Sequence, residues 1–246
     1  MAQETRPRLD QALVDAGLAA SRSRAQALVA AGVVTVDGVT AGRPGVRVAA
    51  SARLAVTGDP LPWVSRGALK LLHALEAFGL SPEGAVALDL GASTGGFTEV
   101  LLARGAAEVW AVDVGHGQLA PKLRADPRVR AIEGRNVRDL KPGDVPAPDW
   151  ITADLSFISL GKAIGPAMGL ARPGATLVAL VKPQFEVGPA HVGKGGIVRD
   201  LAAAEAAAAA VRRFVAGEGW TILGETPSPI PGGDGNAERL LAARRA

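Results

Sequence analysis

The chain of 246 residues lacks cysteine altogether and has only three histidines. The absence of cysteine excludes disulfides, thiolate metal sites and every mechanism that uses a cysteine nucleophile, including the usual covalent route to carbon-5 methylation of pyrimidines. The histidines, His73, His116 and His191, are scattered without the spacing of metal ligands. We therefore predict that the chain holds no metal.

Long hydrophobic runs are also missing. Charged residues interrupt each apolar stretch before it reaches about 18 residues, roughly the length that a membrane-spanning helix needs. The first six residues, Met-Ala-Gln-Glu-Thr-Arg, do not form an apolar signal segment. We therefore expect a cytoplasmic protein without a membrane span.

The chain has little net charge. Its 27 lysines and arginines and 24 acidic residues give a formal net charge of +3. This balance permits a polyanionic partner, although solubility alone also accounts for it. The length fits one large domain, or a medium domain with a small one.

A cofactor loop is predicted within Val86–Gly96. Apolar β-forming residues lead into a turn with Gly91, Gly95 and Gly96, and residues 97–104 then have helical spacing. We expect the glycines to let the backbone approach a ligand, with some of them at positive φ. A purely structural strand-to-helix turn is the alternative.

The spacing of this loop favours one class of cofactor. Its order, Asp-x-Gly-x-x-x-Gly-Gly, differs from the dinucleotide fingerprint Gly-x-Gly-x-x-Gly. The acidic residue, Asp89, would repel a pyrophosphate, but it would suit a sulfonium with an amino-acid tail. The loop therefore points to S-adenosylmethionine.

The residues up to Thr57 have the pattern of a small separate unit. Helices are predicted around Leu9–Val14 and from a cap at Ser21 or Ser23, followed by short strands at residues 33–39, 46–48 and 53–56. Arg22 and Arg24 lie at the start of the second helix, where guanidinium forks and helix N–H groups can bind phosphate. A solvated arginine face is the alternative. A stiff linker is expected at residues 58–62, which include two prolines.

Apolar strands alternate with helical stretches in the rest of the chain. An amphipathic helix with a serine cap is predicted at residues 65–78. The expected strands are residues 86–90, 108–112, 129–132, 150–154, 176–182, 220–225 and 238–243, and the other expected helices are residues 97–104, 119–124, 159–169 and 201–215. This alternation predicts an α/β fold with a doubly wound, mostly parallel sheet.

Ligands of such sheets bind beyond the carboxyl ends of the strands, so polar residues there are candidate site residues. Asp113 follows the second strand about twenty residues after the glycine loop, where an acid can hold both hydroxyls of a cofactor ribose. Asn136 follows the third strand and can bond an adenine edge or serve as a turn residue.

Four charged residues form a second candidate set. Asp154 and Lys182 each end an apolar strand, where a charge must be paired or functional. Glu238 joins them if the last strand is antiparallel, because that strand then begins at the same edge. Lys70 lies between leucines of the helix at residues 65–78. A structural ion-pair cluster, with Lys70 extending to solvent, is the alternative.

The order of residues in the small unit resembles the S4 RNA-binding domain. The matching pattern is Arg8-Leu9-Asp10-x-x-Leu13-x-x-x-Gly17-x-x-x-Ser21-Arg22-x-x-Ala25-x-x-Leu28-x-x-x-Gly32-x-Val34-x-Val36-Asp37-Gly38. The resemblance implies that Arg22 and Arg24 contact RNA phosphates, contacts that position a protein and carry little sequence information. The predicted RNA-binding residues are Arg6, Arg8, Arg22 and Arg24.

The remainder resembles the haemolysin-A-like, or TlyA, ribosomal RNA methyltransferases, which join an S4 domain to an FtsJ-like catalytic domain. The matching motifs are Ser65-Arg66-Gly67-Ala68-Leu69-Lys70-Leu71, Asp89-Leu90-Gly91-Ala92-Ser93-Thr94-Gly95-Gly96-Phe97-Thr98, Asp113-Val114-Gly115-x-Gly117-Gln118-Leu119, Asp154-Leu155-Ser156-Phe157-Ile158-Ser159-Leu160 and Leu180-Val181-Lys182-Pro183-Gln184-Phe185-Glu186. Ala68 departs from the pattern, where a second glycine is expected after Gly67.

This resemblance implies a Rossmann-like methyltransferase with a mostly parallel seven-stranded sheet. It implies an RNA-binding domain at residues 1–59, a linker at residues 60–64 and a catalytic domain at residues 65–246. The family's lysine-aspartate-lysine-glutamate tetrad maps onto Lys70, Asp154, Lys182 and Glu238. The predicted cofactor-binding residues are Asp89, Gly91, Ser93, Thr94, Gly95, Gly96, Phe97, Asp113, Asn136 and Asp154.

The implied reaction is 2′-O-methylation of cytidine in small- or large-subunit ribosomal RNA by S-adenosylmethionine. A ribose 2′-hydroxyl is a poor nucleophile near neutral pH, so the hypothesis is that Lys182 takes its proton, oriented by Asp154 and Glu238. The alternatives are a non-catalytic RNA-binding or ribosome-assembly factor and, taking the haemolysin name literally, a membrane-active protein. The target nucleotide and the oligomeric state are not predicted.

Overall fold

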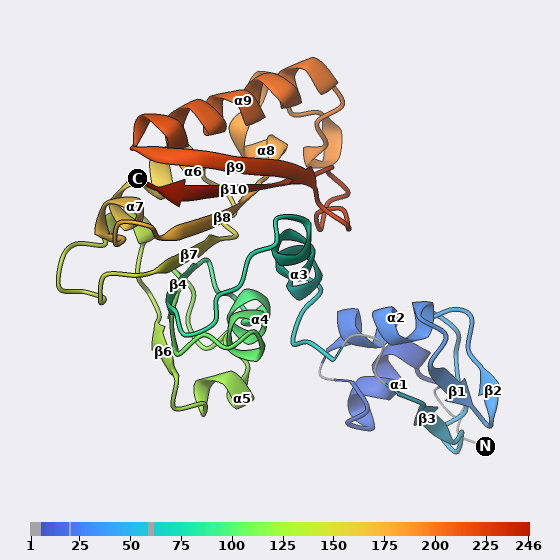
Figure 1. Ribbon diagram of the computed structural model, residues 1–246. Helices are drawn as coiled ribbons and strands as arrows, with labels where there is room; N and C mark the ends of the chain where they lie inside the picture. Colours follow the sequence, from blue (N-terminus) through green and yellow to red (C-terminus); the bar gives the residue numbers. More distant parts are fainter. Residues whose placement is uncertain (1–5, 20, 59–61) are drawn as a thin grey trace. The chain divides into compact units, whose positions relative to one another are not determined.

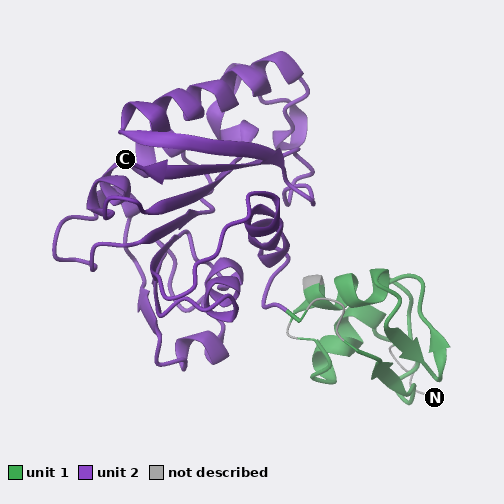
Figure 2. Ribbon diagram, viewed as in Figure 1, with its two compact units in different colours: residues 1–62 green, residues 63–246 purple. Residues whose placement is uncertain are grey.

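The chain forms two compact units, residues 1–62 and 63–246 (Figure 2). The computed structural model describes residues 6–19, 21–58 and 62–246. Residues 59–61, which fall in the predicted linker region, lie outside the described residues. Each unit has hydrophobic clusters of its own.

The small unit packs two helices on a three-stranded antiparallel sheet of order β2-β1-β3 (Figure 1). Its elements are α1 (Leu9–Asp15), α2 (Arg22–Ala30), β1 (Val34–Val36), β2 (Val39–Thr40) and β3 (Leu54–Val56). Ser21 caps α2, because its Oγ accepts a hydrogen bond from Arg24 N at 3.2 Å. Asp37 and Gly38, both at positive φ, form the two-residue turn between β1 and β2.

The predicted strand at residues 46–48 is wrong. Only one bridge forms there, between Arg8 and Arg47. The backbone of this segment bonds to the chain around the start of α1 instead, since Leu9 N donates to Val46 O and Val48 N donates to Pro7 O. The segment therefore covers a helix end and does not extend the sheet.

The larger unit contains a seven-stranded sheet of order β6-β5-β4-β7-β8-β10-β9 (Figure 1). Strands β4 to β8 are parallel, and β10 is antiparallel to both of its neighbours. The strands are β4 (Val86–Leu90), β5 (Glu108–Val112), β6 (Val129–Ile132), β7 (Trp150–Ala153), β8 (Thr176–Val181), β9 (Trp220–Pro227) and β10 (Arg239–Arg245). The predicted doubly wound, mostly parallel sheet is therefore confirmed.

Helices cover both faces of this sheet. They are α3 (Ala68–Ala77), α4 (Gly96–Ala103), α5 (Pro121–Arg124), α6 (Leu160–Ala163), α7 (Gly165–Leu170), α8 (Pro183–Glu186) and α9 (Leu201–Gly217), and three short 3₁₀ turns are η1 (Val137–Asp139), η2 (Pro189–His191) and η3 (Lys194–Gly196). None of the helices in the described part of the chain is long and apolar enough to cross a membrane.

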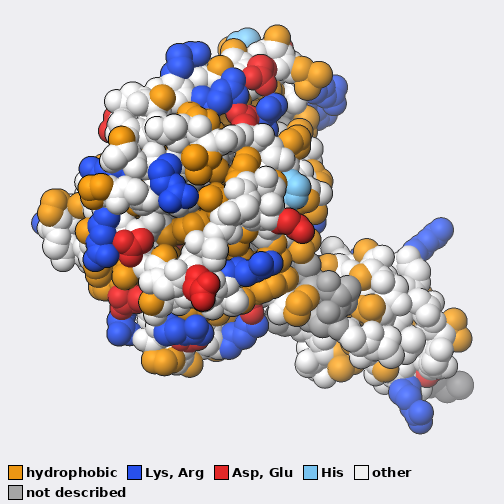
Figure 3. Space-filling model, viewed as in Figure 1, with side chains coloured by type: hydrophobic (Ala, Val, Ile, Leu, Met, Phe, Trp, Pro, Cys, Tyr) orange, Lys and Arg blue, Asp and Glu red, His pale blue; other side chains and the backbone are white. Residues whose placement is uncertain are grey.

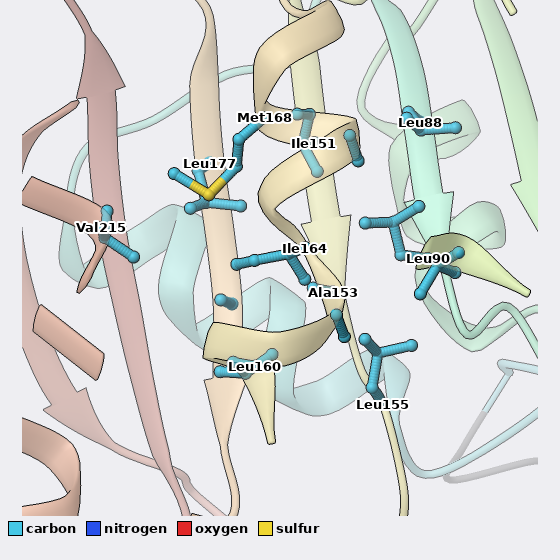
Figure 4. Close-up of a cluster of buried hydrophobic side chains, with 14 of the residues drawn as sticks. Leu88, Leu90, Ile151, Ala153, Leu155, Leu160, Ile164, Met168, Leu177 and Val215 are labelled. Carbon is cyan, nitrogen blue, oxygen red and sulfur yellow. The ribbon is translucent and has the colours of Figure 1, made fainter. Parts of the chain in front are cut away.

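Side chains alternate between two cores along the strands. Leu88, Ile151 and Leu177 point into a cluster with α6, α7 and α9 (Figure 4). Ala87 and Val178 point into the opposite cluster, with α3 and α4. This period of two is what a strand buried on both faces requires.

Two predicted helices differ most from the observed ones. The helix predicted at residues 159–169 is divided into α6 and α7, because Pro166 has no N–H to continue the hydrogen-bond ladder. The helix predicted at residues 65–78 begins at Ala68, and Ser65 does not cap it. Residues 65–67 form a turn instead.

A buried carboxylate organises the helix starts of the small unit. The side chain of Asp10 has no exposed surface and accepts hydrogen bonds from Arg8, Arg22 and Gln26 at 2.9–3.2 Å. The guanidinium of Arg8 is the largest of the influences that hold the pKa of Asp10 well below its ordinary value. Asp10 therefore joins α1 to α2 and holds two arginines at the surface.

We expect Asp10→Asn to destabilise the small unit by about 1.5–3 kcal/mol at neutral pH, because charge-assisted hydrogen bonds are lost. Since the pKa is lowered in the folded state, the stabilisation is present above the unfolded-state pKa of about 3.9 and disappears as the pH falls below it. Hydrogen exchange of amides in α1 and α2 measures the loss. Asp15→Asn, an exposed change on the same helix, is the control, and equal exchange in both variants would contradict the prediction.

A second buried carboxylate lies beneath the glycine loop at residues 91–96. Asp89 in β4 is fully buried and accepts hydrogen bonds from Thr98 Oγ1 at 2.6 Å and Thr152 Oγ1 at 2.9 Å. Burial raises the pKa of Asp89 to about 6, although both threonine hydroxyls oppose the shift. This carboxylate therefore ties β4 to β7 and α4 at a cost in desolvation.

We expect Asp89→Asn to remove a pH dependence of stability. Because the pKa of Asp89 is higher in the folded than in the unfolded state, the folded state binds more protons between about pH 4 and pH 6. The free energy of unfolding of the wild type therefore falls as the pH rises through this range. Relative to Asp89→Asn, the fall should be about 3 kcal/mol. Urea unfolding across this pH range measures it, with the exposed Asp139→Asn as control. If the free energy of unfolding changed equally with pH in wild type and Asp89→Asn, burial would not raise the pKa of Asp89, and the prediction would be wrong.

Candidate active site

The carboxyl ends of the parallel strands meet at one edge of the large sheet. Asp154 directly follows β7, and Lys182 directly follows β8. Strand β10 runs antiparallel beside β8, with Arg239 paired to Val181, so Glu238 reaches the same edge. The antiparallel last strand on which the placement of Glu238 depended is therefore present.

The four charged residues form two short ion pairs. Lys182 Nζ lies 2.6 Å from Asp154 Oδ1 and donates a hydrogen bond to Ser156 Oγ at 3.0 Å. Lys70 Nζ, from α3, lies 2.5 Å from Glu238 Oε2. The Lys70 and Glu238 side chains are only 9% and 2% exposed, so each ion requires the other to offset its desolvation.

The glycine loop packs directly against this charged edge. Gly91 and Gly95 have φ of 81° and 98°, as the sequence pattern predicted for some positions. A Cβ on Gly91 would lie 2.4 Å from Asp154 O, and a Cβ on Gly96 would lie 2.2 Å from Ser65 Oγ. The protein's own backbone thus requires a glycine at position 91, whereas the glycine pattern alone indicates the close approach of a ligand.

Two adjoining clefts open at this edge. One has a volume of about 260 Å³, and its lining includes Lys70, Asp154 and the loop residues Thr94, Gly96 and Phe97. The other has a volume of about 500 Å³, and its lining includes Asp113, Asn136 and Phe157. Because Gly91, Ser93 and Asp154 line both, the clefts meet at the glycine loop.

Asp113 is held so that its carboxylate faces the larger cleft. Its Oδ2 accepts a hydrogen bond from Ser93 N at 2.8 Å, and its Oδ1 accepts one from Gly115 N at 2.7 Å. Each carboxylate oxygen has a second lone pair, so a vicinal diol can still be bound. The left-handed backbone of Ser93, with φ of 49°, directs its N–H to Asp113.

Asn136 and Asp89 have structural partners as well. Asn136 lines the larger cleft, while its Oδ1 caps η1 by accepting a hydrogen bond from Arg138 N at 3.1 Å. This is the turn role that the sequence left open. The Asp89 carboxylate points into the core toward Thr98 and Thr152, so it supports the loop from beneath.

Sequence reasoning missed several residues of the site. Ser156 bonds Lys182, and the turn with Ile230, Pro231 and Gly233 borders the smaller cleft. Thr152 had a signal, because a polar residue within a buried strand requires a partner. No sequence signal marked the turn as part of the site, because only the folding of the chain brings it to the cleft.

The predicted RNA-binding arginines are distributed around the helix starts of the small unit. Arg8 and Arg22 share the Asp10 carboxylate, and their side chains are 47% and 53% exposed. Arg6 accepts a hydrogen bond through its carbonyl from Arg47. Arg24 lies in the first turn of α2. The structure therefore brings Arg8 and Arg22 together, where Asp10 neutralises one of their two charges.

Charge on the larger unit is mixed. Over the face in Figure 3, lysine and arginine side chains lie interspersed with acidic ones. Within the described residues, no group of three or more histidine or acidic side chains is arranged to hold a metal ion.

Comparison with known proteins identifies both units. Residues 63–245 match the model of the FtsJ-like methyltransferases, and residues 7–54 match that of the S4 domain. The chain is 49% identical to the 16S/23S rRNA (cytidine-2'-O)-methyltransferase TlyA of Mycobacterium tuberculosis, over 97% of this chain and 90% of that one. It is 39% identical to Hemolysin A of Brachyspira hyodysenteriae, over 95% and 98% of the two chains.

A solved structure agrees with these matches. A protein of Streptococcus thermophilus that carries the hemolysin name is 40% identical and superposes with a TM-score of 0.78, over 99% of this chain and 90% of that one. The motifs, both domain matches and the fold thus agree along almost the whole chain. The chain belongs to the TlyA family, which joins an S4 domain to an FtsJ-like methyltransferase domain.

Proposed function

We propose that this protein transfers a methyl group from S-adenosylmethionine to the ribose 2′-oxygen of a cytidine in ribosomal RNA. The observation that carries the proposal is that the Lys70–Glu238 and Lys182–Asp154 ion pairs lie at one strand edge, with Lys70 and Asp154 lining the same cleft beside the glycine loop. A non-catalytic assembly factor would not need the nearly buried Lys70–Glu238 pair beside an open cleft.

The two clefts fit S-adenosylmethionine in size and chemistry. The larger one offers the Asp113 carboxylate to the ribose hydroxyls and Asn136 to the adenine edge. The smaller one begins at Gly91, Ser93 and Asp154, where the sulfonium and its amino-acid tail would lie. When bound, the cofactor supplies an electrophilic methyl group for attack by the ribose oxygen.

Lys182 is the residue that takes the proton. In its neutral form, an amine has two N–H bonds and one lone pair. Lys182 Nζ donates a hydrogen bond to Ser156 Oγ and lies 2.6 Å from Asp154 Oδ1 in an ion pair, so once Lys182 has lost a proton its lone pair is available for the proton of the 2′-hydroxyl. As the proton moves to Nζ, the Asp154 carboxylate stabilises the ammonium that forms.

Lys70 and Glu238 orient the substrate side of the cleft. Lys70 lines the smaller cleft while its ammonium is held by Glu238. A cation at this position stabilises the negative charge that develops on the ribose oxygen before the methyl group is transferred. Glu238 fixes the direction of Lys70 and so limits its motion in the cleft.

The S4 domain suggests how RNA is held. Arg6, Arg8, Arg22 and Arg24 would contact backbone phosphates, which would position the substrate without determining the target sequence. The choice of cytidine follows from the name of the Mycobacterium tuberculosis relative, which acts on 16S and 23S rRNA. With ribosomal RNA as substrate, the enzyme would work in the cytoplasm.

The function is tested by mass spectrometry of nucleosides from ribosomal RNA incubated with S-adenosylmethionine and the protein. We expect 2′-O-methylcytidine to appear with wild type and not with Lys182→Ala. Methylation confined to base nitrogens, or no methylation of either ribosomal subunit, would refute the proposal.

We expect Lys182→Ala to lower kcat by about 10²–10⁴-fold, the usual contribution of a general base. Calorimetry should give a Kd for S-adenosylmethionine within about threefold of wild type, because the cofactor contacts lie elsewhere. Lys162→Ala, an exposed change on α6, should leave kcat within about twofold. Near-normal turnover by Lys182→Ala would exclude this lysine as the base.

We expect Asp113→Ala to raise the Kd for S-adenosylmethionine about 10- to 100-fold, because charge-assisted bonds to the ribose and the support of Ser93 are lost together. Calorimetry in the absence of RNA measures this effect. Asp139→Ala, an exposed change in the next loop, is the control. An unchanged Kd would place the cofactor ribose elsewhere.

A further inference from the structure

A buried asparagine lies close to the ion pairs but has no role in the proton transfer described above. Asn236 is 2% exposed, and Glu238, two residues later, is 4% exposed. Most asparagines lie at the surface, so a buried one requires partners for its amide.

The side chain of Asn236 joins two loops that are far apart in the sequence. Its Oδ1 accepts a hydrogen bond from Val198 N at 2.9 Å, and its Nδ2 donates to Gly196 O at 2.8 Å. Both ends of the amide are therefore bonded to the backbone around η3. This bonding fixes the side chain in one orientation.

The backbone of Asn236 closes the turn before β10. Its carbonyl accepts a hydrogen bond from Gly232 N at 2.9 Å, and Gly235 N donates to Gly232 O at 3.0 Å. The same turn contributes Ile230, Pro231 and Gly233 to the smaller cleft. Asn236 thus anchors one wall of that cleft to the loop at residues 196–198.

This turn packs directly on Glu238. A Cβ on Gly232 would lie 2.5 Å from Glu238 Oε1, so the carboxylate has little room to move on that side. The other carboxylate oxygen, Glu238 Oε2, pairs with Lys70. The backbone carbonyl of Glu238 accepts a hydrogen bond from Ser228 N. A shift of the turn would therefore alter the direction of Glu238 and, through it, of Lys70.

We propose that Asn236 is a positioning residue that holds the turn against Glu238 and thereby keeps the Lys70–Glu238 pair in the orientation needed for methyl transfer. The inference rests on the function proposed above. Asn236 lies outside the set of four charged residues but aligns two of them, Lys70 and Glu238.

The kinetic test uses Asn236→Ala with Asp234→Ala, an exposed change in the same turn, as control. We expect Asn236→Ala to lower kcat at least about tenfold, because small misplacements of reacting groups are costly. The thermal midpoint should remain above the assay temperature. Asp234→Ala should keep wild-type kcat within about twofold. Wild-type kcat in folded Asn236→Ala would overturn the proposal.

A double-mutant cycle separates positioning from a general loss of stability. If Asn236 acts through Glu238, adding Asn236→Ala to Glu238→Ala should change kcat by less than about twofold. Losses that multiply in the double variant would instead mean that Asn236 acts independently of Glu238, and would refute the inference. If Asn236→Ala does not fold, Asn236→Asp is used, because it keeps the shape and the acceptor for Val198 N but loses the donor to Gly196 O.

A crystal structure of the variant provides a readout that does not depend on activity. We expect the turn at residues 230–236 to shift and the Glu238 carboxylate to leave Lys70. An unchanged turn and ion pair would overturn the positioning role even if wild type methylates RNA. A shifted pair in a protein whose wild type transfers no methyl group would refute the proposed function alone.

Discussion

The structure of the larger unit depends on the need to offset the desolvation of charges at one sheet edge. Lys70 and Glu238 are nearly buried, and removing an ion from water costs several kcal/mol unless a partner lies in contact. Their partnership requires that β10 enter the sheet antiparallel, beside β8. The departure from a purely parallel sheet is therefore what completes the set of four charges.

The glycine loop is limited by the space that its neighbours leave. Neighbouring atoms occupy the space that a Cβ would take at Gly91, Gly95 and Gly96. A larger residue at these positions would therefore displace the loop or its neighbours. Asp89 supports it from beneath by joining Thr98 and Thr152. Close packing and these two hydrogen bonds therefore join the loop to α4 and to the strand that leads to Asp154.

In the small unit, a buried carboxylate offsets the repulsion between neighbouring arginines. Arg8 and Arg22 lie beside the same carboxylate at the surface of the unit, and their like charges repel one another. The buried Asp10 carboxylate lies between Arg8 and Arg22 and reduces this repulsion while leaving about half of each side chain exposed. The folding of the unit and the exposure of these two arginines thus depend on the same carboxylate.

The sequence by itself determined the local structure and the chemistry of the chain. Apolar periodicity located β4, β5 and β6 at their observed bounds, and the motifs identified the four charged residues, because both signals depend on near neighbours. Tertiary structure alone decided which charges pair, that Asp89 faces the core and that Asn236 holds the turn beside Glu238. It also decided that residues 46–48 join no sheet. These outcomes depend on contacts between residues far apart in the chain, whose free energy is fixed only when the whole fold has excluded water from them.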